Sequence, residues 1–189
     1  RFCSEYLDVQ QDSLVEKTRK LQEDHSYDFT FDDGTLQNIK IIDKKDIHNN
    51  VLQVVNQISQ YGDGVQNRYD VSILVNGLPL VHLELKRRGV NIKEAFKQIH
   101  RYSEDTFNSA HSLYKYVQIF VISNGTLTRY FANTTESKDS NYQFTCEWAD
   151  AKNRTICDLE DFTKTFLEKR VILEVLTKYC VFNMENRLL

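Results

Sequence analysis

Proline, glycine and cysteine are scarce in this sequence, and each shortage excludes a class of protein. The 189 residues include one proline and six glycines, too few for a collagen-like or low-complexity chain. The four cysteines are scattered without a C-x-x-C pair, so neither a zinc ribbon nor a dense disulfide framework is indicated. A reducing, intracellular setting is expected.

Long apolar runs are also absent. The uncharged, largely apolar runs at residues 71–83 and 116–128 are about 13 residues long, whereas a membrane helix needs roughly 20. The 41% hydrophobic and 12% aromatic residues, with a net charge of −3, are an ordinary globular composition, and the length suits a single domain. Because the chain opens at Arg1 and its only methionine is Met184, we expect it to be a piece of a longer protein.

The first third of the chain predicts a helix followed by a hairpin. Ser13 is a candidate N-cap for a helix over residues 13–21. Alternation over residues 27–31 predicts a strand that ends at an Asp-Asp-Gly turn, and the isoleucines of residues 39–42 predict a second strand. Residues 51–58 suit a strand or a short helix, and periodicity does not decide between them.

The middle of the chain gives a clearer pattern. Two apolar runs, residues 70–76 and 80–86, meet at Asn76-Gly77 and predict a β-hairpin. Further along, the pattern predicts a helix over residues 91–106, strands over 117–122 and 127–131, and one or two helices over 158–179. Three strands, a helix and two strands, flanked by further helices, predict an α/β fold built on a mixed β-sheet.

Chemistry-bearing side chains gather at the open end of the predicted hairpin. Residues paired across it have numbers that sum to about 154, which places Asp70 opposite Glu84. Lys86 shares the face of Glu84 because side chains along a strand repeat every two residues. Two carboxylates and a lysine suit Mg²⁺, which takes oxygen ligands at about 2.0 to 2.1 Å and polarises phosphodiesters.

The same three side chains also fit an exposed salt-bridge cluster, which would contribute little to stability. An E-x-K pattern recurs by chance in a chain this charged, and Glu136-Ser137-Lys138 repeats it in a polar stretch without strand context. On this pattern alone, the metal site and the salt-bridge cluster stay equally open.

The helix after the hairpin adds a second signature. Gln98 and Tyr102 lie four residues apart and share a helix face. Together with Asp70 and Glu84-Leu85-Lys86, they resemble the PD-(D/E)xK nuclease signature with the Q-x-x-x-Y extension of RecB-like nucleases. More narrowly, the chain resembles the amino-terminal region of the type I restriction enzyme motor and cleavage subunit, HsdR. The segments that carry this resemblance are residues 67–80 (NRYDVSILVNGLPL), 83–89 (LELKRRG), 94–102 (EAFKQIHRY), 120–125 (FVISNG) and 129–134 (RYFANT).

This resemblance implies a restriction-endonuclease-like core that depends on Mg²⁺. The catalytic and metal-binding groups it implies are Asp70, Glu84, the backbone carbonyl of Leu85, and Lys86 at the attacking water. The DNA-binding or nuclease-supporting residues it implies are Gln98, Tyr102, Arg87 and Arg88. Helix packing is an equally open reason for Tyr102, and His82 on the Glu84 face is interpreted as structural. Family members often add an acid from a preceding helix, for which Glu16 is a weak stand-in.

The resemblance also implies a setting. It implies an R subunit that cuts double-stranded DNA in a bacterial or archaeal cytoplasm, with modification (HsdM) and specificity (HsdS) subunits and with its own motor domains, which lie outside this chain. The pattern G-x-x-x-x-G-K-[ST] occurs nowhere, so ATP is expected only in the full-length subunit. Residues 1–35, 36–135 and 136–189 are expected to form a leading helix and hairpin, the catalytic core, and a loop with helices leading toward the motor.

Basic residues favour a DNA-binding surface locally. Between residues 86 and 101 there are six Lys or Arg against Glu94, a local +5 in a chain of −3. A solvated helix face is the alternative. Two other functions therefore stay open beside the nuclease, namely a docking domain without cleavage and a nucleic-acid-binding module without chemistry.

Overall fold

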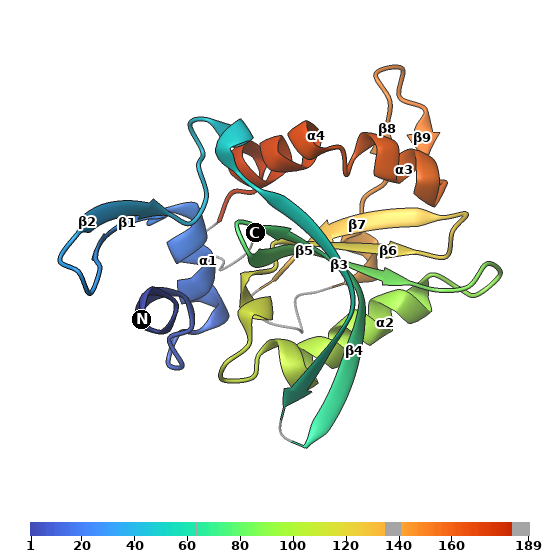
Figure 1. Cartoon of the computed structure of the whole chain (residues 1–189). Coiled ribbons are helices and arrows are strands. Elements are labelled where there is room, and N and C mark those ends of the chain that lie inside the picture. The colour runs from blue at the N-terminus through green and yellow to red at the C-terminus, as the bar shows by residue number, and fades with distance from the viewer. Residues whose placement is uncertain (63, 135–140, 183–189) are drawn as a thin grey trace.

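A five-stranded sheet in the order β3-β4-β5-β6-β7 forms the centre of the structure, a computed structural model that describes residues 1–62, 64–134 and 141–182 (Figure 1). Its strands are β3 (Leu52–Gly62), β4 (Val65–Val75), β5 (Leu78–Leu85), β6 (Ile119–Ser123) and β7 (Thr128–Ala132). β5 and β6 are parallel, and the other neighbouring pairs are antiparallel. The predicted mixed sheet is confirmed.

Helices cover both faces of this sheet. α2 (Lys93–Tyr102) connects β5 to β6 and lies on one face, as a parallel pair requires a crossover connection. α3 (Leu159–Thr165) and α4 (Lys169–Glu174) lie on the opposite face (Figure 1), and α1 (Leu14–Gln22) packs at its edge. The predicted α/β class with flanking helices is therefore confirmed.

Local signals explain where several elements begin and end. The hydroxyl of Ser13 accepts the Glu16 N–H, and the Glu16 carboxylate accepts the Ser13 N–H at 2.6 Å, so a capping box starts α1. These bonds also lower the pKa of Glu16. Residues 52–58, whose pattern suited either a strand or a short helix, lie in strand β3. α2 ends at Tyr102, earlier than predicted, because the chain continues as a π-helical turn at Ser103–Phe107.

Two small hairpins lie outside the main sheet. β1 (Ser26–Thr30) pairs with β2 (Leu36–Lys40), and β8 (Trp148–Ala149) pairs with β9 (Thr155–Ile156). Ile41 and Ile42, predicted within the second strand, instead follow β2 and are buried in the core. The second E-x-K pattern, at residues 136–138, lies outside the described residues. The division of the chain into three segments stays a prediction.

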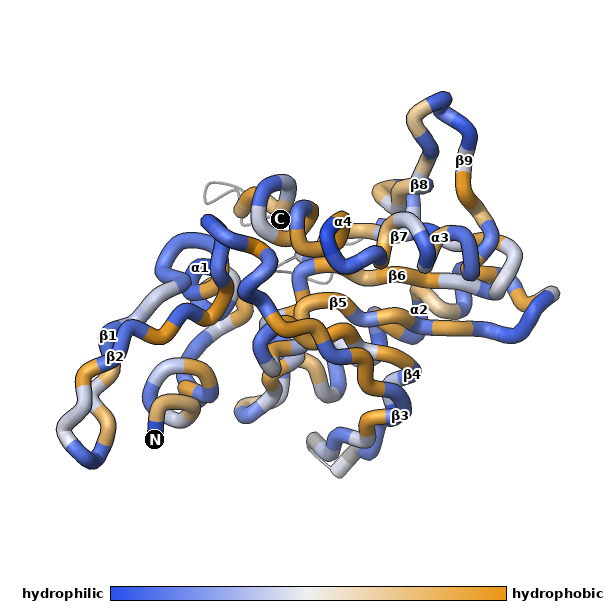
Figure 2. The backbone as a smooth tube through the Cα atoms, turned by 45° about the horizontal axis from the view of Figure 1, so that its top comes forward, coloured by the Kyte–Doolittle hydropathy of each residue, from blue (hydrophilic) through white to orange (hydrophobic). Residues whose placement is uncertain are grey.

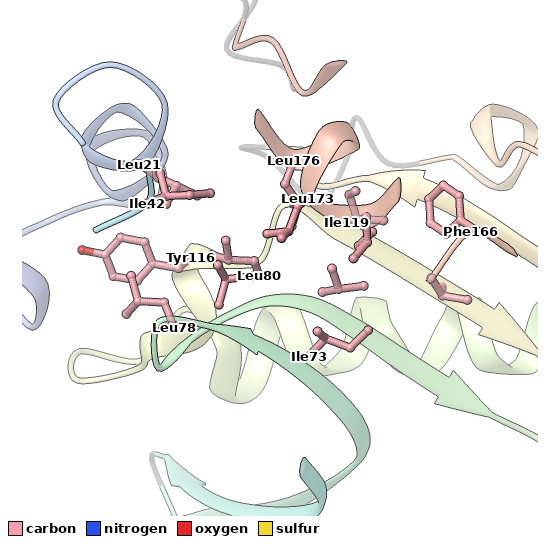
Figure 3. Packing of buried hydrophobic residues seen from close by; sticks show 14 of the residues in the cluster. Leu21, Ile42, Ile73, Leu78, Leu80, Tyr116, Ile119, Phe166, Leu173 and Leu176 are labelled. Carbon is pink, nitrogen blue, oxygen red and sulfur yellow. The ribbon is translucent and has the colours of Figure 1, made fainter. Parts of the chain in front are cut away.

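The sheet has two chemically different faces. The face under α3 and α4, here called the aliphatic face, is filled mainly by branched side chains, and Figure 3 shows Leu173 and Leu176 packed toward Ile119. The face under α2, here called the aromatic face, is formed by Tyr69, Ile92, Ala95, Phe96, Ile99, Tyr102, Phe107, Tyr114, Val117, Phe120, Ile122 and Phe131. Hydrophobic residues run along most of β5 and β6, whereas the loops at the sheet ends are hydrophilic (Figure 2).

Candidate active site

The register of the β4–β5 hairpin brings the two predicted acids to the same end of its paired region. Its register pairs Val71 with Leu83 and Ser72 with His82, so the predicted sum of 154 holds on the side of the acids. A bulge between Ile73 and Leu74 shifts the register nearer the turn. Beyond Val71 no further pair with β5 forms, and the strands separate.

Asp70 uses this separation. Its carboxylate accepts the backbone N–H of Leu85 at 2.8 Å, in place of a ladder hydrogen bond between main chains. β4 also changes face here, because Tyr69 packs in the aromatic face while Val71 packs against the aliphatic one. Residues two apart in a regular strand share a face, so the irregularity is centred on Asp70. Asp70 is therefore fixed at the end of the paired region, half-buried and beside the chain of Leu85.

Glu84 lies inside the protein on the α2 side of the sheet. Its side chain is 1% exposed, and one oxygen, Oε1, accepts the Lys86 ammonium at 2.9 Å. The other oxygen, Oε2, is buried and has no hydrogen-bond partner among the described residues. Its neighbour His82 lies with Nε2 at 3.7 Å, beyond hydrogen-bond distance, and that nitrogen also lacks a partner.

Lys86 starts a chain of hydrogen bonds that ends on β4. Its ammonium donates to Glu84 and to the side-chain carbonyl of Gln98, whose NH₂ donates to the Tyr102 hydroxyl. That hydroxyl in turn donates to the backbone carbonyl of Arg68 at 3.0 Å. Burial of Tyr102 raises the pKa of its hydroxyl, so it stays a donor. The helix and the hairpin thus hold Lys86 from two sides.

A cleft of about 370 Å³ opens where β4 and β5 separate. It is lined by Asp70, Val71, Leu85, Lys86 and Arg87, and from β3 by Asn56 and Gln57. Asp70 and Lys86 therefore reach solvent, whereas Glu84 lies behind them. Arg88 does not line this cleft, because its side chain lies against the turn at Gly125.

The basic segment after β5 does not act as one surface. Arg87 faces the cleft, but Lys97 forms an ion pair with Glu94 at 3.0 Å on the exposed side of α2. Lys93 lies over the ring of Tyr142, 5.1 Å from its centroid. The local charge of the segment is thus divided between the cleft and the outer surface of α2.

The residues at the cleft fit a divalent cation. Within the part of the chain that the structure describes, the buried Glu84 Oε2 has no hydrogen-bond partner, and an unpaired carboxylate oxygen is an atom that a cation would satisfy. Among the described residues, no group of three or more His, Cys, Asp and Glu side chains could hold a metal. A cation here would take two carboxylates, with the Leu85 carbonyl, water and phosphate oxygens as its remaining ligands, which is the usual pattern for Mg²⁺.

The mixed sheet, its covering helices and the acid–acid–lysine cluster at the strand ends define a nuclease-like α/β core of the PD-(D/E)xK type. Residues 4–139 match the family described as the type I restriction enzyme R protein N terminus. The chain belongs to this family.

Curated relatives are endonuclease subunits. The chain is 54% identical over 189 residues to the type I restriction enzyme EcoprrI endonuclease subunit of Escherichia coli, which covers all of this chain and 60% of the relative. It is 39% identical over 158 residues to the SauMSSORF170P endonuclease subunit of Staphylococcus aureus, covering 84% of this chain and 16% of the relative. The chain therefore spans only part of the length of these relatives.

Sequence reasoning missed two parts of the site. The backbone carbonyl of Arg68 anchors the Tyr102 hydroxyl, and a main-chain acceptor carries no residue-type signal. The two-residue repeat of a strand places His82 and Glu84 on the same face, but it does not predict that both side chains are buried there. None of the described helices combines the length and apolar character that spanning a bilayer requires.

Proposed function

We propose that this chain is the Mg²⁺-dependent nuclease domain that cleaves double-stranded DNA in the R subunit of a type I restriction enzyme. The observation that carries the proposal is the position of Lys86, held by Glu84 and Gln98 beside Asp70 at an open cleft. A salt-bridge cluster without a function would not need Gln98, on α2, to orient the lysine. Family membership and the names of the relatives support the same activity.

Each residue has a role that follows from its contacts. Bound Mg²⁺ would supply Lewis-acid activation of the phosphodiester and of water, held by Asp70, Glu84 and the Leu85 carbonyl. A lysine ammonium has three N–H donors, and two of those on Lys86 are used by Glu84 and Gln98. The third is left for the attacking water or a phosphate oxygen, where it neutralises developing negative charge. Gln98 and Tyr102 act as positioning residues.

The wider assembly belongs to the same proposal. The full subunit would carry ATP-dependent motor domains outside this chain and work with modification (HsdM) and specificity (HsdS) subunits. Arg87 lines the cleft and would contact the DNA backbone, whereas Arg88 would act away from it. A docking domain without cleavage remains the second candidate function.

Metal binding separates these two functions. Calorimetric titration of this chain with Mg²⁺ and Mn²⁺, with and without a short DNA duplex, should show saturable binding that Asp70→Asn and Glu84→Gln both remove. Glu94→Gln is the matched control, because Glu94 is an exposed carboxylate that forms an ion pair with the surface residue Lys97. Absence of saturable binding even with duplex present would favour the docking function.

A further inference from the structure

Gln57 has an unusual backbone at the level of Asp70. Its φ is 53°, in the left-handed region that a residue with a branched or long side chain rarely adopts. The β3–β4 ladder passes from the pair Asn56–Val71 to the pair Ile58–Tyr69 and omits the pair between them. By count, that omitted pair is Gln57 and Asp70. Backbone strain therefore sits directly across the strand from a candidate catalytic acid.

No side-chain hydrogen bond among the described residues accounts for this backbone conformation. Asn76 also has a positive φ, 51°, but its amide bonds the Val51 N–H, the Ile41 carbonyl and Asn50, which hold the β4–β5 turn in place. The Gln57 side chain makes no hydrogen bond with another described residue and is exposed. Strained residues of this kind concentrate at functional sites, where the surroundings keep a side chain in place for a ligand.

The surroundings of Gln57 indicate the ligand. Gln57 lines the cleft together with Asp70, Lys86 and Arg87. The wall that β3 contributes is neutral, formed by Asn56 and Gln57, while the wall after β5 is cationic. The NH₂ of a carboxamide can donate to a phosphate oxygen, and because it is neutral it neither attracts the acids nor repels a bound cation. Glutamine is among the side chains that contact DNA phosphates.

We propose that Gln57 is a DNA-contacting residue of the nuclease, whose amide NH₂ donates to a phosphodiester oxygen from the β3 side of the cleft. The inference rests on the proposed function and adds a contact on the wall opposite Lys86. The left-handed backbone is then the means by which β3 turns this side chain toward the substrate.

Glycine separates the side chain from the backbone. Gln57→Gly removes the amide and relieves the strain, because glycine adopts a positive φ at no steric cost. We expect its thermal midpoint to equal or exceed that of the wild type and its Mg²⁺ affinity to stay within twofold. Duplex cleavage by the complete subunit in its assembled enzyme should fall about 10- to 100-fold, the value of one hydrogen bond to a charged group. Gln57→Asn, which keeps a carboxamide and tolerates this φ, should recover part of the rate.

Two control variants isolate the cleft. Asn153→Gly relieves a positive φ of 59° in the β8–β9 turn, and Gln53→Ala removes an exposed amide elsewhere on β3; both should cut at the wild-type rate. Wild-type cleavage by Gln57→Gly would overturn the inference, as would loss of Mg²⁺ affinity, which would make Gln57 a metal ligand. Lys86→Ala is measured alongside. If it is inactive while Gln57→Gly is active, only this inference fails; if both cut normally, the proposed function fails as well.

Discussion

The two faces of the central sheet use the same strands for different purposes. On β5, Leu83 points into the aliphatic face, whereas His82 and Glu84 point toward α2 and the aromatic face. The aliphatic face buries side chains that need no partners, and its burial contributes stability in proportion to apolar area. The α2 side buries the Glu84 carboxylate and His82, whose facing atoms have no hydrogen-bond partner among the described residues, an arrangement that costs free energy.

The two-residue repeat of a strand thus places the packing side chains on one face of the sheet and the chemically active side chains on the other. We expect a loss of apolar contacts in the aliphatic core away from Val71 and Leu85 to leave the cleft intact, and a loss of charge at the cleft to leave that core filled. Substitutions at the cleft should therefore change cleavage, and substitutions on the aliphatic face should change stability.

The largest effect is expected from the charged groups at the cleft. Lys86→Ala and Asp70→Asn should reduce duplex cleavage by the complete subunit about 100- to 1000-fold or more, since each removes charge stabilisation that acts in the transition state. Lys86→Ala also leaves the buried Glu84 carboxylate without its ammonium partner, so a loss of stability is expected, and circular dichroism should establish that each variant is folded before cleavage is compared. Retained cleavage by Lys86→Ala would refute its assignment, and Glu94→Gln serves as the charge-matched control for Asp70→Asn.

The second-largest effect is expected on the aliphatic face, where a substitution should lower stability and leave cleavage unchanged. Leu173 is fully buried in α4, and Leu173→Ala should lower the free energy of unfolding by about 3 kcal/mol through lost burial and a cavity. Urea unfolding measures this loss, with the exposed Leu36→Ala as control. Cleavage per folded molecule should not change. A specific loss of cleavage at constant folded fraction would show that the two faces are coupled.

A smaller effect is expected at the junction between helix and cleft. Tyr102→Phe removes the hydroxyl that joins Gln98 to the Arg68 carbonyl, so Lys86 is held less firmly. We expect a stability loss of about 1 kcal/mol and roughly tenfold slower cleavage. Tyr179→Phe, at a tyrosine that is 74% exposed, is the matched control. Unchanged cleavage in Tyr102→Phe would leave only helix packing for this residue.

The smallest effect concerns alkaline pH. Burial raises the pKa of Tyr114 to about 12, above the value of about 10 for an unfolded tyrosine. The folded state favours the neutral hydroxyl, so this contribution to stability is fully present below pH 10 and is lost between about pH 10 and 12. Urea unfolding at pH 8 to 12 should therefore show a shallower alkaline decline for Tyr114→Phe than for the wild type. Identical slopes would contradict the prediction.

Much of the architecture was predictable because it depends on local patterns. The hairpin about Asn76-Gly77, the capping box at Ser13 and the apolar repeat of α2 each follow from residues near one another in sequence. The end of α2 was less predictable, because Ser103–Phe107 keeps a helical pattern while its backbone widens into a π-helical turn. The strand at residues 52–62 was ambiguous because a short apolar run suits either element.

Sequence by itself determined the hairpin about Asn76-Gly77, the register that brings Asp70 and Glu84 to the same end of it, and the helix face shared by Gln98 and Tyr102. These follow from periodicities of two and of 3.6 residues, which are properties of the local backbone. Tertiary structure alone decided that Glu84 is buried with one unpaired oxygen, that Lys86 meets Gln98, and that Gln57 lies strained across from Asp70. Those outcomes depend on how separate elements pack in space, and the local periodicity of each element does not specify that packing.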